Sequence, residues 1–234
     1  MRSWIPNSIT MGNLLMGCLA IVFSTSSEPD HYLLGMTCVV IAGLLDFLDG
    51  LVARALGVSS ALGAQLDSLA DVVTFGVVPG LWASSLLPED SGLRFIPFII
   101  AIGAAYRLGR FNLDTEAAAH FKGLPVPASA MIWVAAMGLH LQWMDDTGAG
   151  LPHGVIYALS LITTLLMVST VPLLNLKFKG LKWEGQSIKW ILLMVCIVTF
   201  AVMGLLGKSV YISILLSVAI YLMLSLVHYK KLSS

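Results

Sequence analysis

Apolar runs long enough to cross a bilayer follow one another almost from end to end of this chain. A helical span needs about 20 consecutive, mostly apolar residues, and short clusters of glycine, proline and charged residues separate candidates of that length. The eight candidate spans are residues 11–26, 32–55, 62–86, 94–112, 127–144, 153–175, 187–206 and 209–228. The sequence therefore predicts an all-α fold, a polytopic integral membrane bundle of about eight transmembrane helices.

The composition supports a protein that lies mostly in lipid. Hydrophobic residues make up 58% of the chain and charged residues 11%, against about 25% charged residues in an ordinary soluble domain. No stretch is left for a sizeable soluble domain, so we expect residues 1–234 to form a single membrane domain, with residues 1–10 as a short interfacial segment before the first span. A formal net charge of zero gives no indication of nucleic-acid binding.

The basic residues predict how the chain crosses the membrane, because Lys and Arg collect on the cytoplasmic side. Arg94 and Lys208 alone fall at span ends on one side. The other side collects Arg2, Arg54, Arg107, Arg110, Lys122, Lys177, Lys179, Lys182, Lys189, Lys230 and Lys231. Both termini are therefore expected in the cytoplasm, and the host membrane is expected to be a bacterial cytoplasmic membrane.

Four aspartates, Asp46, Asp49, Asp67 and Asp71, lie within the second and third predicted spans. An aspartate in the middle of a span costs about 2.5–3.5 kcal/mol on insertion scales, so the four together cost roughly 10 kcal/mol before any relief from the interface. Lipid offers nothing that compensates this cost, whereas a bound cation would compensate it.

Helical periodicity places these carboxylates together, because each residue turns the helix by about 100°. One arc of the second span carries Asp46, Asp49, Gly50, Ala53 and Arg54. One side of the third span carries Ser60, Gly63, Asp67, Asp71 and Thr74. The short turn at residues 57–60 makes the two spans antiparallel neighbours, so the carboxylates can converge near the cytoplasmic end.

Four converging carboxylates match two divalent cations, and hard oxygen ligands favour Mg²⁺ or Mn²⁺. Gly50 and Gly63 are predicted to lie where a ligand approaches the backbone, since each costs about 1 kcal/mol relative to alanine within a helix. Arg54 is predicted to meet a pyrophosphate oxygen. Intramembrane carboxylates also serve ion transporters and proton relays, so charge placement alone leaves a metal-dependent enzyme and an ion pathway both open.

The spacing over residues 46–71 is DxxDGxxAR, eight residues, then GxxxDxxxD. It resembles the signature of the CDP-alcohol phosphatidyltransferase family at every fixed position. The resemblance implies a six-helix core over residues 1–175, two additional transmembrane helices over residues 187–228, and a homodimer. It also implies that the four aspartates bind two divalent metal ions and that Asp71 is the catalytic base. The residues it implies for binding CDP-diacylglycerol are Asn7, Thr10, Asn13, Gly50, Ala53, Arg54, Ser60, Gly63 and Asp67.

Further stretches resemble the members of the family that use L-serine as the acceptor alcohol. They are residues 5–10 with Asn13, residues 66–79, residues 107–112 and residues 123–127. The implied reaction is attack of the serine hydroxyl on the phosphorus that bears diacylglycerol, with release of CMP.

Arg107, Arg110 and Asn112 are candidates to hold the serine carboxylate or the acceptor-side phosphate. Ordinary positive-inside anchoring also explains the two arginines. Glycerol 3-phosphate or inositol phosphate stays open as the acceptor, and an ion-coupled transporter and a structural scaffold stay open as functions from other classes.

Overall fold

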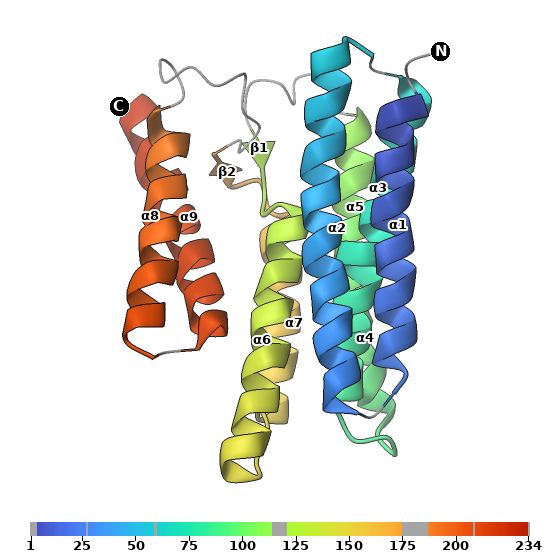
Figure 1. Ribbon diagram of the computed structural model, residues 1–234, viewed down its shortest axis with the longest axis vertical. Helices are drawn as coiled ribbons and strands as arrows, with labels where there is room; N and C mark the ends of the chain where they lie inside the picture. The colour runs from blue at the N-terminus through green and yellow to red at the C-terminus, as the bar shows by residue number, and fades with distance from the viewer. Residues whose placement is uncertain are drawn as a thin grey trace.

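The computed structural model describes residues 4–26, 28–58, 60–113, 121–174, 187–207 and 209–233, and in these ranges the chain is almost entirely helical (Figure 1). The elements are α1 (Trp4–Ser24), α2 (Pro29–Leu56), α3 (Ala61–Asp71), the π-helix η1 (Val72–Val77), α4 (Val78–Ser85), the 3₁₀-helix η2 (Gly92–Phe98), α5 (Ile99–Leu113), β1 (Phe121–Lys122), α6 (Val126–Thr147), α7 (His153–Val168), β2 (Pro172–Leu173), α8 (Ser187–Leu205) and α9 (Val210–Ser233).

Each predicted span corresponds to one helical segment, since α3, η1 and α4 follow without a break and η2 leads directly into α5. Within the described ranges, five segments are long and apolar enough to cross a membrane: Trp4–Ser24, Pro29–Leu56, Ala61–Ser85, Gly92–Leu113 and Val210–Val227. Large apolar side chains such as Leu44, Leu62 and Ile102 are exposed on the outside of the bundle, which suits contact with lipid tails. The prediction of an all-α polytopic membrane protein is confirmed.

Two expected boundaries are wrong. Residues 4–10 form the start of α1 rather than a separate interfacial segment. Pro6 permits this because it lies near the start of the helix, where backbone N–H groups have no intrahelical partner. The sixth predicted span ends early, at Val168, because Ser169 is extended with ψ 161° and Pro172 has no N–H for a helical hydrogen bond.

The connection between α2 and α3 fixes the end of the bundle at which the aspartates lie. Gly57 adopts the left-handed conformation with φ 64°, and its N–H bonds to the carbonyls of Ala53 and Arg54, which ends α2. Ser60 begins α3, and its hydroxyl accepts the Gly63 N–H at 2.9 Å. The last turns of α2 and the first turns of α3 therefore lie at the same end of the bundle.

Helix α1 packs closely against η1 because Gly17 has no side chain. A Cβ added at Gly17 would lie 3.1 Å from Thr74 Cα and closer still to its hydroxyl. The Thr74 hydroxyl in turn donates to the backbone carbonyl of Asn13 at 3.3 Å. The π-helical turn begins directly after Asp71, and such turns are frequent at functional sites. This packing brings one face of α1 against the acidic face of α3.

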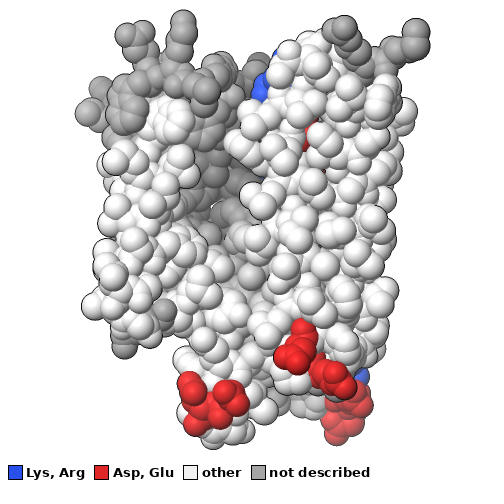
Figure 2. Space-filling view, in the orientation of Figure 1, with Lys and Arg blue, Asp and Glu red and all other residues white. Residues whose placement is uncertain are grey.

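The two ends of the bundle differ in charge. Acidic residues gather at the end drawn lowest in Figure 2, where α1 is joined to α2, α4 is joined to η2 and α6 ends; these residues are Glu28, Asp30, Glu89, Asp90, Asp145 and Asp146. Helix α1 begins and α9 ends at the opposite end (Figure 1). The described basic residues follow the predicted division: Arg94 lies at the acidic end, and the opposite end has Arg54, Arg107, Arg110 and Lys122 toward it. Arg2, Lys177, Lys179, Lys182 and Lys208 lie outside the described residues, as do the side chains of Lys189, Lys230 and Lys231.

Candidate active site

Three of the four predicted aspartates converge between the last turns of α2 and α3. Asp46 and Asp49 are one turn apart on α2, and Asp67 faces them from α3. One carboxylate oxygen from each lies within 4.8 Å of the other two. Asp49 is 6% exposed, and the other two are half-buried. The predicted acidic cluster is therefore present, and it is supplied by two adjacent helices.

Asp71 lies one turn beyond Asp67 and deeper in the bundle, with 5% of its surface exposed. Its carboxylate is close enough to Asp46, Asp67 and Asp49 to interact electrostatically with each of them. The Asn13 side-chain amide donates to Asp71 Oδ1 at 3.1 Å. Asp71 is thus a neighbour of the cluster and has a partner of its own on α1.

Helix α1 supplies hydrogen bonds to two of the four carboxylates. The Thr10 hydroxyl donates to Asp49 Oδ2 at 2.5 Å, and Asn13, one turn later, donates to Asp71. Thr10 is 4% exposed and Asn13 is fully buried. The sequence predicts both as contacts of CDP-diacylglycerol, whereas the structure places both against the carboxylates themselves. Both hydrogen bonds orient the acidic groups, and the contact of these two residues with CDP-diacylglycerol stays a prediction.

The remaining residues predicted to bind CDP-diacylglycerol lie on the turns of α1, α2 and α3 next to this cluster. A Cβ at Gly50 would lie 3.2 Å from the Arg54 guanidinium, and a Cβ at Gly63 would lie 3.0 Å from the Asn7 side-chain oxygen. Polar side chains of the chain itself thus lie beside both glycines. Arg54 is exposed, Ala53 precedes it half-buried, and the Ser60 hydroxyl caps α3. The guanidinium of Arg54 is thus exposed beside Gly50, and its contact with a phosphate stays a prediction.

The converging donor set fits a hard divalent cation. All three donors are carboxylates, and oxygen donors of this kind suit Mg²⁺ or Mn²⁺ better than softer metals. Three carboxylates within 4.8 Å of one another repel each other strongly where little water screens them. A cation would remove that repulsion. Asp71 lies outside this set of three, and its service as a metal ligand remains a prediction.

Of the three residues predicted to bind the acceptor, the structure brings one close to Asp71 and gives the other two different partners. Arg107 is 7% exposed and interacts electrostatically with Asp71, so the structure brings it to the site. Arg110 donates instead to the Val168 carbonyl at the end of α7, at 3.2 Å. Asn112 donates to the Ser68 hydroxyl on α3, at 2.9 Å. These two side chains hold α5 against its neighbours.

One buried side chain near Arg107 has no counterpart in the sequence predictions. Tyr221 of α9 is 4% exposed and interacts electrostatically with Arg107. Its signal in the sequence is a tyrosine and Ser225, one turn apart, within an otherwise apolar span. Which helix they face could not be inferred from that spacing.

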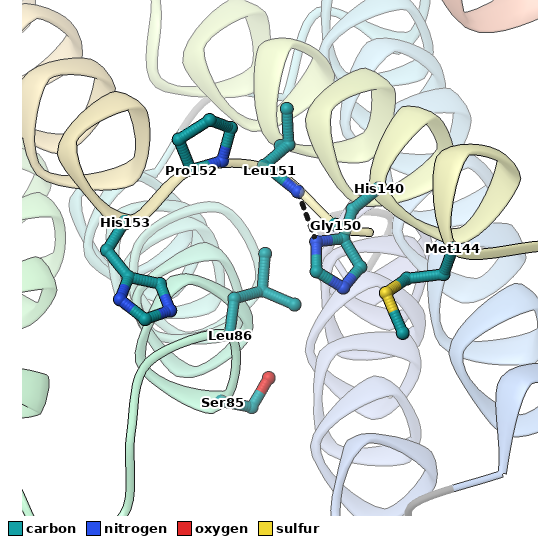
Figure 3. Close-up of a pocket in the computed structure, with 8 residues that line it drawn as sticks. All are labelled: Ser85, Leu86, His140, Met144, Gly150, Leu151, Pro152 and His153. Atoms are coloured by element: carbon teal, nitrogen blue, oxygen red, sulfur yellow. Dashed lines mark hydrogen bonds between the residues drawn. The ribbon is translucent and has the colours of Figure 1, made fainter. Parts of the chain in front are cut away.

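A separate hollow of about 510 Å³ lies near the acidic end of the bundle, between the end of α4 and the turn that joins α6 to α7 (Figure 3). His140 Nδ1 accepts the Leu151 N–H there at 3.1 Å. A Cβ at Gly150 would overlap the His140 ring, so the glycine lets the turn close over the histidine. None of the four aspartates lines this hollow, and its contacts organise the α6–α7 turn.

Comparison with known proteins decides between the enzyme and the ion pathway. The family model for CDP-alcohol phosphatidyltransferases matches residues 3–174. This chain belongs to the CDP-alcohol phosphatidyltransferase family. The match includes the acidic cluster, Asp71, the α1 residues that bond to the carboxylates, and Arg107. The protein is therefore a membrane-bound transferase, and the matched residues include the acidic cluster.

Curated relatives from several bacteria and an archaeon carry one name. CDP-diacylglycerol–serine O-phosphatidyltransferase of Helicobacter pylori strain 26695 is 31% identical over 183 residues, which cover 76% of this chain and 74% of the relative. The enzyme of that name from Bacillus subtilis strain 168 is 36% identical over 140 residues, covering 56% and 74%. That of Methanocaldococcus jannaschii is 32% identical over 168 residues, covering 71% and 72%.

Proposed function

We propose that this transferase moves the phosphatidyl group of CDP-diacylglycerol to the hydroxyl of L-serine and releases CMP. The observation that carries the proposal is the convergence of Asp46, Asp49 and Asp67 beside Asp71, in a chain whose curated relatives are named for serine as the acceptor. The proposal includes a single membrane domain, with a six-helix core and two additional C-terminal helices.

In the proposed reaction Asp71 takes the proton of the serine hydroxyl. The serine oxygen forms a bond to the phosphorus that bears diacylglycerol, and the bond from that phosphorus to the CMP oxygen breaks. A carboxylate is a weak base for an alcohol near neutral pH, so Asp71 contributes mainly by positioning and by accepting the proton late. Asn13 holds Asp71 in place through its hydrogen bond.

The other site residues bind and orient the substrates. Two divalent ions held by the carboxylates would supply charge neutralisation at the pyrophosphate and at the attacking and leaving oxygens. Thr10 fixes the Asp49 carboxylate through its hydrogen bond. Arg54 reaches a phosphate oxygen from the mouth of the cluster, and Arg107 binds the serine carboxylate, for which a planar guanidinium offers paired donors.

The site is proposed to face the cytoplasm of a bacterial cell. Support comes from the positions of Arg54, Arg107 and Arg110, which lie toward the end of the bundle that carries the cluster, since basic residues collect on the cytoplasmic side. A homodimer is also proposed, from the family resemblance, and chemical cross-linking in membranes tests it.

An acceptor panel tests the function. Purified protein is supplied with CDP-diacylglycerol, Mn²⁺ and, in separate reactions, L-serine, glycerol 3-phosphate or inositol phosphate, and CMP is measured. Serine should be required for rapid CMP release, and phosphatidylserine should form in equal amount. CMP release that depends on another alcohol and does not depend on serine would show that serine is not the acceptor. Ion flux across sealed vesicles without CMP release would contradict the proposal that the protein is an enzyme.

A further inference from the structure

A groove between α2 and α6 lies near the acidic end of the bundle, and its volume is about 530 Å³. Its lining comes from the start of α2, the second half of α6 and the start of α9. The volume is within the range of small-molecule sites. None of the four aspartates lines this groove, and Leu33, which does, is about 20 Å along α2 from Asp46. The α2–α6 groove is therefore separate from the acidic cluster.

The α2–α6 groove changes from polar to apolar along its length. Helix α6 runs toward the acidic end, so Gly138 lies deepest and Asp145 lies about 10 Å further out. Leu141 of α6 and Leu33 of α2 add apolar side chains to the lining. At the deep end the Tyr211 ring packs against Gly138 so closely that a Cβ there would overlap the ring. The groove therefore combines apolar walls with a carboxylate at its outer end.

Among the described residues that line the groove, Asp145 alone carries a charge. Its side chain is exposed, and within the described ranges no residue forms an ion pair or a hydrogen bond with its carboxylate. Glu28 and Asp30 flank Pro29 on the α2 side, and Figure 2 shows the acidic groups at this end of the molecule. A carboxylate only accepts hydrogen bonds and an ammonium group only donates them, so the outer end of the groove suits a cationic headgroup.

We propose that the α2–α6 groove binds a membrane phospholipid that carries a primary ammonium headgroup. One acyl chain lies along Leu141 and Leu33 toward Tyr211, where it gains van der Waals contacts, and the ammonium group meets the Asp145 carboxylate. The headgroup then lies at the membrane surface and the chain points into the bilayer, as in the surrounding lipid. This site is distinct from that of CDP-diacylglycerol, and it does not depend on which alcohol the enzyme uses.

The headgroup preference tests the role of Asp145. Purified full-length protein in detergent is mixed with equal amounts of phosphatidylethanolamine and phosphatidylglycerol, and native mass spectrometry counts the lipid of each kind that stays bound. Wild type should retain more phosphatidylethanolamine, and Asp145→Asn should lower the ratio of the two lipids about fivefold, the effect of one charge near a membrane surface. Asp146→Asn removes the same charge from a neighbour that does not line the groove and should keep the wild-type ratio. Equal ratios for wild type and Asp145→Asn, or an equal fall in both variants, would overturn the proposal.

Filling the groove tests the place at which the lipid binds. Leu33 and Leu34 are 44% and 46% exposed, so a larger side chain displaces no core residue at either position, and of the two only Leu33 lines the groove. Leu33→Trp should abolish the preferential retention of phosphatidylethanolamine, whereas Leu34→Trp should keep it. Melting temperatures in detergent check that both variants are folded. Equal retention by the two variants would overturn the proposal while leaving the proposed function intact, and a failure of serine-dependent CMP release in wild type would leave these lipid counts as a test of the groove.

Discussion

At the scale of single residues, the site depends on a hydrogen-bonded pair from two helices. Asp71 is nearly buried on α3, and Asn13 of α1 donates to it. An arrangement of this kind fixes the direction of the carboxylate before the substrate arrives. Mutations at Asp71 and at Asn13 can therefore test the carboxylate and its hydrogen-bond donor separately.

Asp71→Asn keeps the shape of the side chain but removes the proton acceptor. Loss of general-base assistance should lower kcat by about 10²-fold or more, while the KM for CDP-diacylglycerol changes little. Steady-state CMP release at varied CDP-diacylglycerol measures both. A variant with wild-type kcat would show that another group takes the proton.

Asn13→Ala removes the donor and leaves the Asp71 carboxylate without its partner on α1. A hydrogen bond to a charged group is worth about 1.5–3 kcal/mol, so kcat should fall about tenfold or more. Ser8→Ala, at an exposed position of α1, is the matched control and should retain wild-type kcat. Equal rates for the two variants would exclude a positioning role for Asn13.

At the scale of helices, the contact between α1 and η1 depends on a glycine. Gly17→Ala would place a Cβ 3.1 Å from the Thr74 backbone and nearer to its hydroxyl, which forces the helices apart. We expect a lower melting temperature in detergent and weaker activity. Gly43→Ala is the control, because that Cβ would meet no atom within 4 Å and alanine favours a helix by about 1 kcal/mol. A melting temperature for Gly17→Ala at or above that of Gly43→Ala would contradict this packing.

The helices and the acidic arc could be predicted because each follows from a single periodicity. Hydrophobic runs gave all eight segments, and a 3.6-residue period placed Asp46, Asp49 and Asp67 on facing sides. The hydrogen bonds from α1 to the carboxylates could not be predicted in the same way. Periodicity places Thr10 and Asn13 on one face, but it does not say whether that face meets substrate or the carboxylates.

Contacts between segments far apart in the chain could also not be predicted from the sequence. The antiparallel pair β1 and β2 joins residues about 50 positions apart through two residues each, which is too short for a period-2 pattern. The hydrogen bond from the Tyr221 hydroxyl to the Leu174 carbonyl joins α9 to the residue after β2, and a single tyrosine within an apolar span is also typical of plain packing. Such contacts depend on how whole helices dock.

At the scale of the whole molecule, the distribution of charge predicts its orientation. Single cysteines are placed at Asp90, in an acidic turn, and at Ala55, exposed near the cluster end of α2. On intact cells a membrane-impermeant maleimide should label Asp90→Cys and should label Ala55→Cys only after permeabilisation. The reverse pattern would place the site on the outer side.

The central claim is that the acidic cluster holds the divalent ions on which serine-dependent phosphatidyl transfer relies. Protein stripped of metal with a chelator is given CDP-diacylglycerol and L-serine, and CMP release is followed as Mn²⁺ is added to wild type and to Asp67→Asn. The account predicts no release without metal, full recovery in wild type, and no recovery in Asp67→Asn at Mn²⁺ concentrations that saturate wild type. Undiminished release from the stripped protein, or the same titration curve for both proteins, would contradict it.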